Sequence, residues 1–283
     1  MEQNFFQHVA LAIIAMVACG FDTVAQQVPS EQHLTFTLPS GQRFKMVYVE
    51  GGTFVMGCTP EQGDQCNSDE LPAHNVTLSS YYMAEYEVTQ ELWQAVMGTS
   101  IYEQQRKAER RSTYGVGDNH AMYYINYTDC EEFCDRLNEL LRDHLPQGFK
   151  FGLPTEAQWE YAARSGVKAK HTIYAGSDHI DEVAWYGENR SGGVKPVGLK
   201  NPNELGLYDM SGNVWEWCAD QYSRSYYSSS PQQDPENLSE GSYCVIRGGG
   251  WYSDASICRV SSRCYDALSN RYYFVGFRLA LVR

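Results

Sequence analysis

Residues 153–162 read LPTEAQWEYA, and residues 206–217 read GLYDMSGNVWEW. The first stretch predicts the start of a helix, because Thr155 is a favourable N-cap and Gln158, three residues later, completes a capping box. In the second stretch the polar and small residues 211–213 predict a turn, and we expect the tryptophans that follow to pack in the core. Both a helix and an irregular turn that leads into a buried segment therefore belong to the expected fold.

Two further helices are predicted on either side of the middle of the chain. Thr89 precedes the amphipathic run QELWQAVM at residues 90–97, and Gly98 is a suitable residue to end it. Residues 128–131 (TDCE) form a capping box for a helix that runs to about Arg142.

Short apolar segments between these helices predict strands. Residues 44–49 and 52–56 are expected to form a hairpin, and residues 243–247 and 277–282 to form core strands near the end. The serine-rich stretch 223–230 is expected to be an exposed loop. Few helices among many short, glycine-punctuated segments predict an α+β domain with little regular secondary structure.

Composition indicates a globular protein with an acidic surface. The chain has 283 residues, of which 43% are hydrophobic and 20% charged, and its formal net charge is -13. That charge argues against a nucleic-acid partner, because phosphate contacts need a surface rich in lysine and arginine. With no internal repeat and no long linker, we expect one domain.

The N-terminus is predicted to be a targeting segment. Residues 9–21 (VALAIIAMVACGF) are apolar but too short to cross a bilayer, which favours a signal peptide over residues 1–25 and an extracytoplasmic location: periplasmic, outer-membrane-associated or secreted. The MVAC sequence ending at Cys19 also resembles a bacterial lipobox, so a lipid anchor at Cys19 is a second interpretation. No other segment predicts a transmembrane anchor. Residues 26–42 are then an N-terminal extension, and residues 43–283 are the domain.

Cysteine usage is consistent with export. The chain has nine cysteines, and loss of Cys19 with the signal peptide leaves eight, an even number that fits disulfides. There is no CxxC motif, which argues against a zinc ribbon. Cys130 and Cys134 are expected to pair elsewhere or to stay reduced in the core.

Several phrases of the chain resemble those of the formylglycine-generating enzyme (sulfatase-modifying factor) family. They occur in the family's order, as VEGGTFVMG at 49–57, EVT at 87–89 with Trp93 and Met97-Gly98, LPTEAQWEYA at 153–162, GLYDMSGNVWEW at 206–217, RGGGW at 247–251 and GFR at 276–278. The resemblance covers about residue 45 to the end. It implies a C-type-lectin-like α+β fold with little regular secondary structure, and relatives that oxidise a cysteine of a sulfatase peptide (Cys-x-Pro-x-Arg) to formylglycine.

The resemblance also implies a calcium site. Asp209, Gly212, Val214 and Glu216 match positions that hold Ca²⁺ in relatives through a side chain, two carbonyls and a carboxylate. Such hard oxygen donors suit Ca²⁺. By spacing alone, a solvated turn would be the commoner explanation of this pattern.

A copper site is implied by the resemblance but is incomplete here. Relatives hold Cu(I) between two cysteines that follow the RGG motif, and the matching positions after Arg247 are Ser253 and Cys258. A serine hydroxyl is a hard, neutral ligand that cannot replace a thiolate for soft Cu(I). Asp254 and Gly250 stand where relatives usually have histidine and serine. The sequence therefore argues against Cu(I) at this site.

Cys258 has other interpretations. It is expected to be a structural disulfide partner or a buried thiol. Cys218 is the first candidate for its partner, with Cys244 and Cys264 as rivals. Either rival could also approach the catalytic pocket, although neither matches the family's spacing.

Two functions from different classes remain, and whether the chain is an enzyme stays open. It could be a formylglycine-generating oxidoreductase that uses Cys258 as its surviving thiol. It could instead be a binding or scaffold module, whose aromatic surface engages a protein or glycan outside the cytoplasm. Ser253 favours the binding module. The chain has no HxH or HxxxH pair, GxSxG elbow, GxGxxG loop or Walker loop, so other enzyme classes have little support.

Overall fold

The computed structural model describes residues 32–283, which form an α+β unit with three antiparallel or mixed sheets. The strands are β1 (His33–Thr37), β2 (Arg43–Val49), β3 (Gly52–Met56), β4 (His74–Leu78), β5 (Tyr81–Ala84), β6 (Lys150–Gly152), β7 (Trp215–Gln221), β8 (Tyr243–Arg247), β9 (Arg263–Ala267), β10 (Val275–Gly276) and β11 (Ala280–Val282). The helices are α1 (Gln90–Met97), α2 (Ile101–Lys107), α3 (Tyr127–Leu140), α4 (Glu156–Ala163) and α5 (Ile180–Val183). No helix within residues 32–283 is long and apolar enough to cross a membrane.

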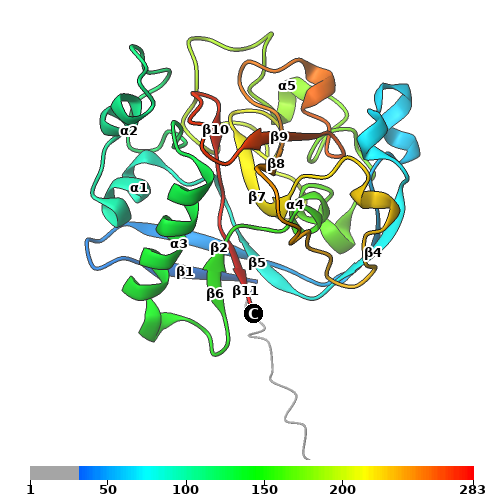
Figure 1. The fold of residues 1–283 in the computed structure, drawn as a ribbon, viewed down its shortest axis with the longest axis horizontal. Helices are drawn as coiled ribbons and strands as arrows, with labels where there is room; N and C mark the ends of the chain where they lie inside the picture. The colour runs from blue at the N-terminus through cyan, green and yellow to red at the C-terminus, as the bar shows by residue number, and fades with distance from the viewer. Residues whose placement is uncertain (1–31) are drawn as a thin grey trace, which may run out of the picture. The chain divides into compact units, whose positions relative to one another are not determined.

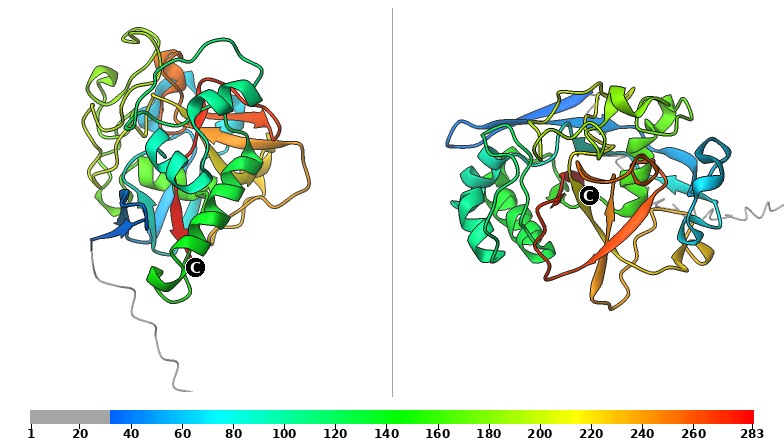
Figure 2. Two further views of the ribbon diagram at one scale, coloured as in Figure 1. Left: turned by 90° about the vertical axis from the view of Figure 1, so that its left-hand side faces the viewer. Right: turned by 90° about the horizontal axis from the view of Figure 1, so that it is seen from above.

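The largest sheet brings together the two ends of the described chain. Its strand order is β1-β2-β5-β11-β6, and β11 inserts between β5 and β6 with Leu281 opposite Tyr82 and Phe151 (Figure 1). Helices α1, α2 and α3 lie together on one side of the molecule (Figure 2). Trp93 of α1 stacks on Phe133 of α3 at 5.6 Å between ring centroids, inside this apolar layer.

The predicted hairpin of residues 44–49 and 52–56 is wrong in its pairing. Both segments are strands, but β2 pairs with β1 and β5, whereas β3 pairs with β4. The chain diverges at Gly51, where it runs so close to the end of β4 that a Cβ atom would lie 2.4 Å from the Leu78 carbonyl oxygen. The chain therefore leaves the sheet of β2 at this point, and β3 belongs to a different sheet.

The C-terminal strand prediction is also corrected. Residues 243–247 form β8 as expected, but the single strand predicted over 277–282 is replaced by β10 and β11 with a break between them. Arg278 lies in that break and turns its side chain inward to Glu216. A buried ion pair therefore interrupts the strand.

Two of the predicted helix starts are confirmed, and the third helix begins earlier than predicted. Thr89 caps α1, and Thr155 caps α4 with the reciprocal bond from Gln158. For the third helix the capping box is Asn126 with Asp129, two residues before the predicted one. Asparagine caps at least as well as threonine, so local preference allows either start.

Two predicted loop regions contribute to the packed unit. Strand β1 lies within the stretch assigned to the N-terminal extension, residues 26–42, and it pairs with β2 along its whole length. The serine-rich stretch 223–230 carries a 3-10 turn in which Tyr227 is only 2% exposed, so it is not wholly exposed. The Tyr227 hydroxyl donates to Glu156 at 3.2 Å.

Buried ion pairs connect α4 to the four-stranded sheet, whose order is β10-β7-β8-β9. Glu156 pairs with Arg263 at 2.6 Å, and Glu160 pairs with Arg247 at 2.5 Å. Arg164 pairs with the other oxygen of Glu160 at 2.9 Å. These side chains are almost completely buried, so each depends on its partner for compensation of its charge.

Replacing Arg247 should therefore destabilise the fold strongly. We expect Arg247→Ala to lower the free energy of unfolding by about 3–5 kcal/mol, because it leaves one oxygen of the buried Glu160 carboxylate without its arginine partner while Arg164 holds only the other oxygen. The matched control is Arg136→Ala, which breaks the exposed pair with Glu132 and should cost no more than about 1 kcal/mol. Urea unfolding of both variants measures the difference, and equal losses would contradict the assignment.

Candidate functional site

Ser253 and Cys258 lie in the loop between β8 and β9, on either side of a short 3-10 turn. The Ser253 hydroxyl accepts a hydrogen bond from the Gly250 amide at 3.0 Å, and its carbonyl accepts one from the Gly187 amide at 2.8 Å. Cys258 packs directly against the RGG motif, since a Cβ atom on Gly249 would lie 2.6 Å from its sulfur. Ser253 is therefore part of the backbone architecture of this loop.

Cys258 is a buried, neutral thiol. It packs in an apolar cluster with Ala184 and Tyr186 and is fully buried. Burial, assisted by the charge of Asp254, raises the pKa of the thiol to about 12. At neutral pH it carries its proton and behaves as a small apolar side chain.

Of the two interpretations of Cys258, a disulfide partner or a buried thiol, the structure shows the buried thiol. Cys218, Cys244 and Cys258 are all buried free thiols, and Cys264 is a half-buried one. The disulfide found in the described part of the chain joins Cys58 to Cys66, whose Cα atoms are 6.0 Å apart. Cys130 and Cys134 stay reduced in the core, which was one of the two expectations for them.

These residues do not fit Cu(I). The ion favours thiolates, whereas this loop offers a hydroxyl that already accepts a backbone bond and a protonated thiol. We therefore derive no reaction step through copper.

The loop from Asp209 to Glu216 places one unusual oxygen in the interior. Asp209 is 2% exposed and has a left-handed backbone conformation (φ 56°). Its Oδ2 accepts a hydrogen bond from the Gly198 amide at 2.7 Å, but its Oδ1 is buried and has no hydrogen-bond partner among residues 32–283. Such an orphaned oxygen is costly unless another group compensates it.

Glu216 is held by two other signature phrases of the sequence. Arg278 of the GFR phrase donates to both carboxylate oxygens, at 2.6 Å each, and the Trp159 indole donates to Oε2 at 2.7 Å. Glu216 therefore serves as a structural anchor, whatever else it binds.

A third buried carboxylate adjoins this loop and was not singled out as a site residue from the sequence. Glu87 accepts hydrogen bonds from the Asn213 side chain at 2.6 Å and the Val214 amide at 3.1 Å. Burial and the charges of Asp209 and Glu216 raise its pKa well above the ordinary value. Glu87 is the first residue of the EVT phrase, but nothing in that phrase predicts its contact with Asn213 and Val214.

The charges of this region leave room for a cation. Glu87, Asp209 and Glu216 are buried carboxylates, and Arg278 is the buried cation that faces them. Among these groups the unpartnered Asp209 Oδ1 is a hard oxygen donor of the kind that Ca²⁺ prefers.

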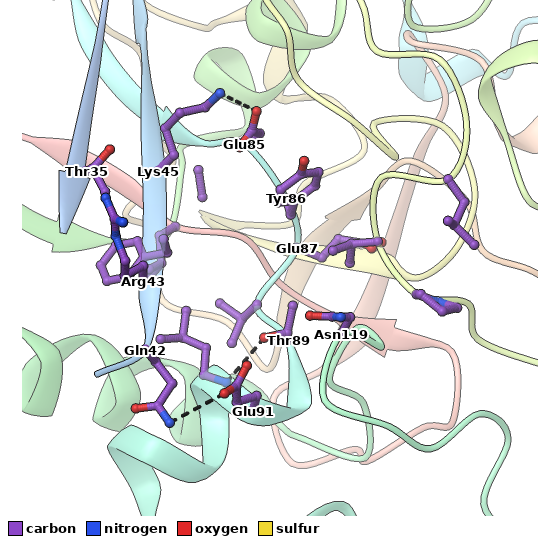
Figure 3. Close-up of a pocket in the computed structure, with 18 residues that line it drawn as sticks. Thr35, Gln42, Arg43, Lys45, Glu85, Tyr86, Glu87, Thr89, Glu91 and Asn119 are labelled. Carbon is purple, nitrogen blue, oxygen red and sulfur yellow. Dashed lines mark hydrogen bonds and ion pairs between the residues drawn. The ribbon is translucent and has the colours of Figure 1, made fainter. Parts of the chain in front are cut away.

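A cavity of about 480 Å³ has Glu87 in its lining (Figure 3). It is bordered by β2, by the segment that joins β5 to α1, and by residues 196–199. Much of its polar lining is paired, as Lys45 with Glu85 and Gln42 with Glu91 (Figure 3). Neither Ser253 nor Cys258 lines this cavity, so it is separate from the loop expected to bind copper.

An aromatic surface adjoins Ser253. We define the aromatic platform as the residues Tyr114, Trp251, Tyr252, Tyr273 and Phe274. Tyr114 contacts Trp251 and Tyr273 at 5.7 and 4.7 Å between ring centroids, and Tyr252 stacks on Phe274 at 5.9 Å. Tyr252 is half exposed, and Trp251 is almost buried.

The platform is bonded to the loop that holds Asp209. The Trp251 amide donates to the Asn213 carbonyl at 2.7 Å, and the Trp215 amide donates to the Phe274 carbonyl at 2.8 Å. The position of the platform therefore depends directly on the conformation of residues 209–216.

Residues 31–282 match the sulfatase-modifying factor enzyme 1-like domain. The chain belongs to this family. It is 34% identical over 256 residues to "Chaperone protein LppX" of Paenibacillus barcinonensis, an alignment that covers 76% of this chain and 81% of that one. It is also 37% identical over 145 residues to the formylglycine-generating enzyme of Streptomyces coelicolor, covering 45% of this chain and 46% of the enzyme.

Solved structures show the same fold. "Treponema denticola variable protein 1" superposes with a TM-score of 0.75 and 29% sequence identity, over 89% of this chain and 99% of that chain. The expected family and its fold are thus confirmed. The family includes relatives with quite different names, so membership alone does not assign an activity.

Thiol labelling tests the environment assigned to Cys258. At neutral to mildly alkaline pH we expect iodoacetamide to modify Cys264 before Cys258 in the native protein, because Cys264 is half-buried whereas Cys258 is inaccessible and protonated. Peptide mass spectrometry locates the modified residue, and labelling in denaturant provides the control. Equal rates for the two thiols in the native protein would contradict the structure.

Proposed function

We propose that this chain is a protein-binding module that acts outside the cytoplasm and has no copper-dependent oxidase activity. The observation that carries the proposal is the state of the two residues at the copper position. The Ser253 hydroxyl is engaged by the Gly250 amide, and Cys258 is a buried, protonated thiol. The loop can thus support a surface but lacks the thiolate pair for the family's chemistry.

The aromatic platform is the proposed binding surface. Tyrosine and tryptophan are enriched at protein interfaces, because they offer a large contact area together with a polar group. The platform lies next to Ser253 and is supported from below by residues 209–216. A partner that is a protein is further supported by the relative named as a chaperone, which aligns with most of this chain.

Calcium is the proposed support of that surface. Asp209 Oδ1, the carbonyls of Gly212 and Val214, and the remaining electron pairs of Glu216 would hold the ion. When bound, Ca²⁺ supplies positive charge to a region rich in buried carboxylates. The turn at residues 212–214 connects this site to the platform, because the Asn213 carbonyl accepts a hydrogen bond from the Trp251 amide.

An extracytoplasmic location is supported by the Cys58–Cys66 disulfide, since disulfides persist mainly in oxidising compartments. The predicted signal peptide, residues 1–25, and the lipid anchor at Cys19 lie outside the described residues. Both remain part of the proposal.

The alternative function is a formylglycine-generating oxidoreductase, and a turnover assay separates the two. The purified protein is loaded with Cu(I), given O2 and a peptide containing Cys-x-Pro-x-Arg, and the peptide mass is followed. We expect no aldehyde, while an active formylglycine-generating enzyme converts the peptide under the same conditions. Aldehyde formation that is lost in Cys258→Ala would overturn the proposal.

Calcium binding is tested by thermal unfolding with and without chelator. A ligand at about 100 times its Kd stabilises by about 2.7 kcal/mol, which for a domain of this size raises the Tm by about 5–10 °C. We expect chelation to lower the Tm of the natural protein by that amount and to leave the Tm of Asp209→Ala unchanged, because the orphaned oxygen has been removed.

The matched control for the calcium experiment is Asp64→Ala, which removes an exposed carboxylate and should keep the full effect of calcium. Glu216→Ala is less informative, because it also breaks the bonds to Arg278 and Trp159. If chelation leaves the Tm of the natural protein unchanged, the calcium proposal is wrong.

A further inference from the structure

Two arginines flank the aromatic platform. The Arg190 guanidinium lies over the Tyr252 ring, 5.8 Å from its centroid. Arg110 lies in the segment that runs from α2 to Tyr114 of the platform, and this segment is bonded to the core where the Tyr124 hydroxyl donates to the Ser112 carbonyl at 2.8 Å. Two positive charges thus border one half-exposed aromatic surface.

Basic residues are concentrated in the segment that leads to Tyr114, where residues 106–111 hold four basic side chains and one acid, Glu109. The formal net charge is -13, yet residues 106–111 contain Arg106, Lys107, Arg110 and Arg111. Arg110 and Arg190 are exposed, and neither forms an ion pair with any side chain in residues 32–283. Their charges are therefore available to a partner.

The Tyr273 hydroxyl of the platform lies within electrostatic range of both guanidinium groups, and Arg190 also contacts the platform directly through the Tyr252 ring. Burial raises the pKa of this hydroxyl, with smaller increases from Tyr252 and Tyr114, while Arg110 and Arg190 oppose the rise. Both arginines are thus close enough to affect a single hydroxyl of the platform.

Some acidic residues of the neighbouring segments are already engaged. Glu103 accepts from the Ser100 amide at 2.7 Å as the cap of α2, and Glu188 lies 3.4 Å from the Tyr186 hydroxyl. Glu109 and Asp254 are exposed acids that reduce the positive charge without pairing with either arginine.

We propose that the platform binds an acidic, aromatic- or apolar-containing peptide segment of a partner protein, with Arg110 and Arg190 as the residues that recognise its carboxylates. This inference rests on the proposed function and names the chemistry of the partner. A guanidinium presents a planar fork that matches a carboxylate, and Arg190 is ordered by its contact with Tyr252. The apolar residues of the segment would contact the exposed part of Tyr252 and its neighbours.

Contacts within the platform favour a peptide over a glycan. A sugar that stacks on an aromatic side chain needs an open ring face. Phe274 and Arg190 already lie against the Tyr252 ring, and Trp251 is only 7% exposed. The same arginines would repel the arginine-bearing sulfatase peptide, in agreement with the loss of the copper thiol at Ser253.

Binding of peptide pools tests the proposal. Three fluorescein-labelled pools of 12-residue peptides carry tyrosine at a third of their positions, and glutamate, glutamine or lysine at the others. We expect the full chain to bind the glutamate pool about tenfold more tightly than the glutamine pool, to bind the lysine pool weakest, and to lose the preference as salt is raised.

Charge reversal locates the site. Arg110→Glu combined with Arg190→Glu should weaken binding of the glutamate pool at least tenfold, with the Tm unchanged because both side chains are exposed. The matched control is Lys150→Glu, which reverses an exposed charge on β6 of the five-stranded sheet. This variant should bind the glutamate pool as the natural protein does.

The outcomes separate this inference from the function on which it rests. Equal binding of the glutamate and glutamine pools, weakened by Tyr252→Ala, would keep the binding module and overturn the role of the arginines. Binding of a polyuronate but of no peptide pool would assign the arginines to a glycan and overturn the peptide. Failure of every probe at millimolar concentration would overturn both proposals.

Discussion

The structure depends on carboxylates buried against arginines. Glu216 sits where three signature phrases meet, bonded to Arg278 and to the Trp159 indole. The neighbouring pair of Glu160 and Arg247 joins α4 to β8 in the same way. A buried charge without its partner costs several kcal/mol, so these pairs specify which segments come together in a fold with little regular secondary structure.

The same frame holds the loop that carries Ser253 and Cys258. The RGG motif begins with Arg247, which α4 holds in place, and the loop that follows packs Cys258 against Gly249. In this loop Ser253 stands at the position where the family resemblance implies a thiol, and its hydroxyl accepts a hydrogen bond from the Gly250 amide. The aromatic platform is built on that loop and on residues 209–216, so surface and frame are directly connected.

Local signals account for the parts of the fold that were predicted correctly. The caps Thr89 and Thr155 act within a few residues, and both helices begin where those residues indicate. The hairpin of β2 and β3 and the single C-terminal strand were wrong, because each depends on distant partners: Gly51 meets Leu78, and Arg278 meets Glu216. For Cys258 the structure selects the buried thiol over the disulfide, the two interpretations that the sequence left open.

The sequence by itself determined the family, the fold class and the incompleteness of the copper site, since these follow from residue types and their spacing around Ser253 and Cys258. Only the tertiary structure decided that Glu87 joins Asp209 and Glu216, that Asp209 Oδ1 is left without a partner, and that Arg110 and Arg190 border one aromatic surface. The physical reason is that charge balance and burial are properties of neighbours in space, and these neighbours lie far apart along the chain.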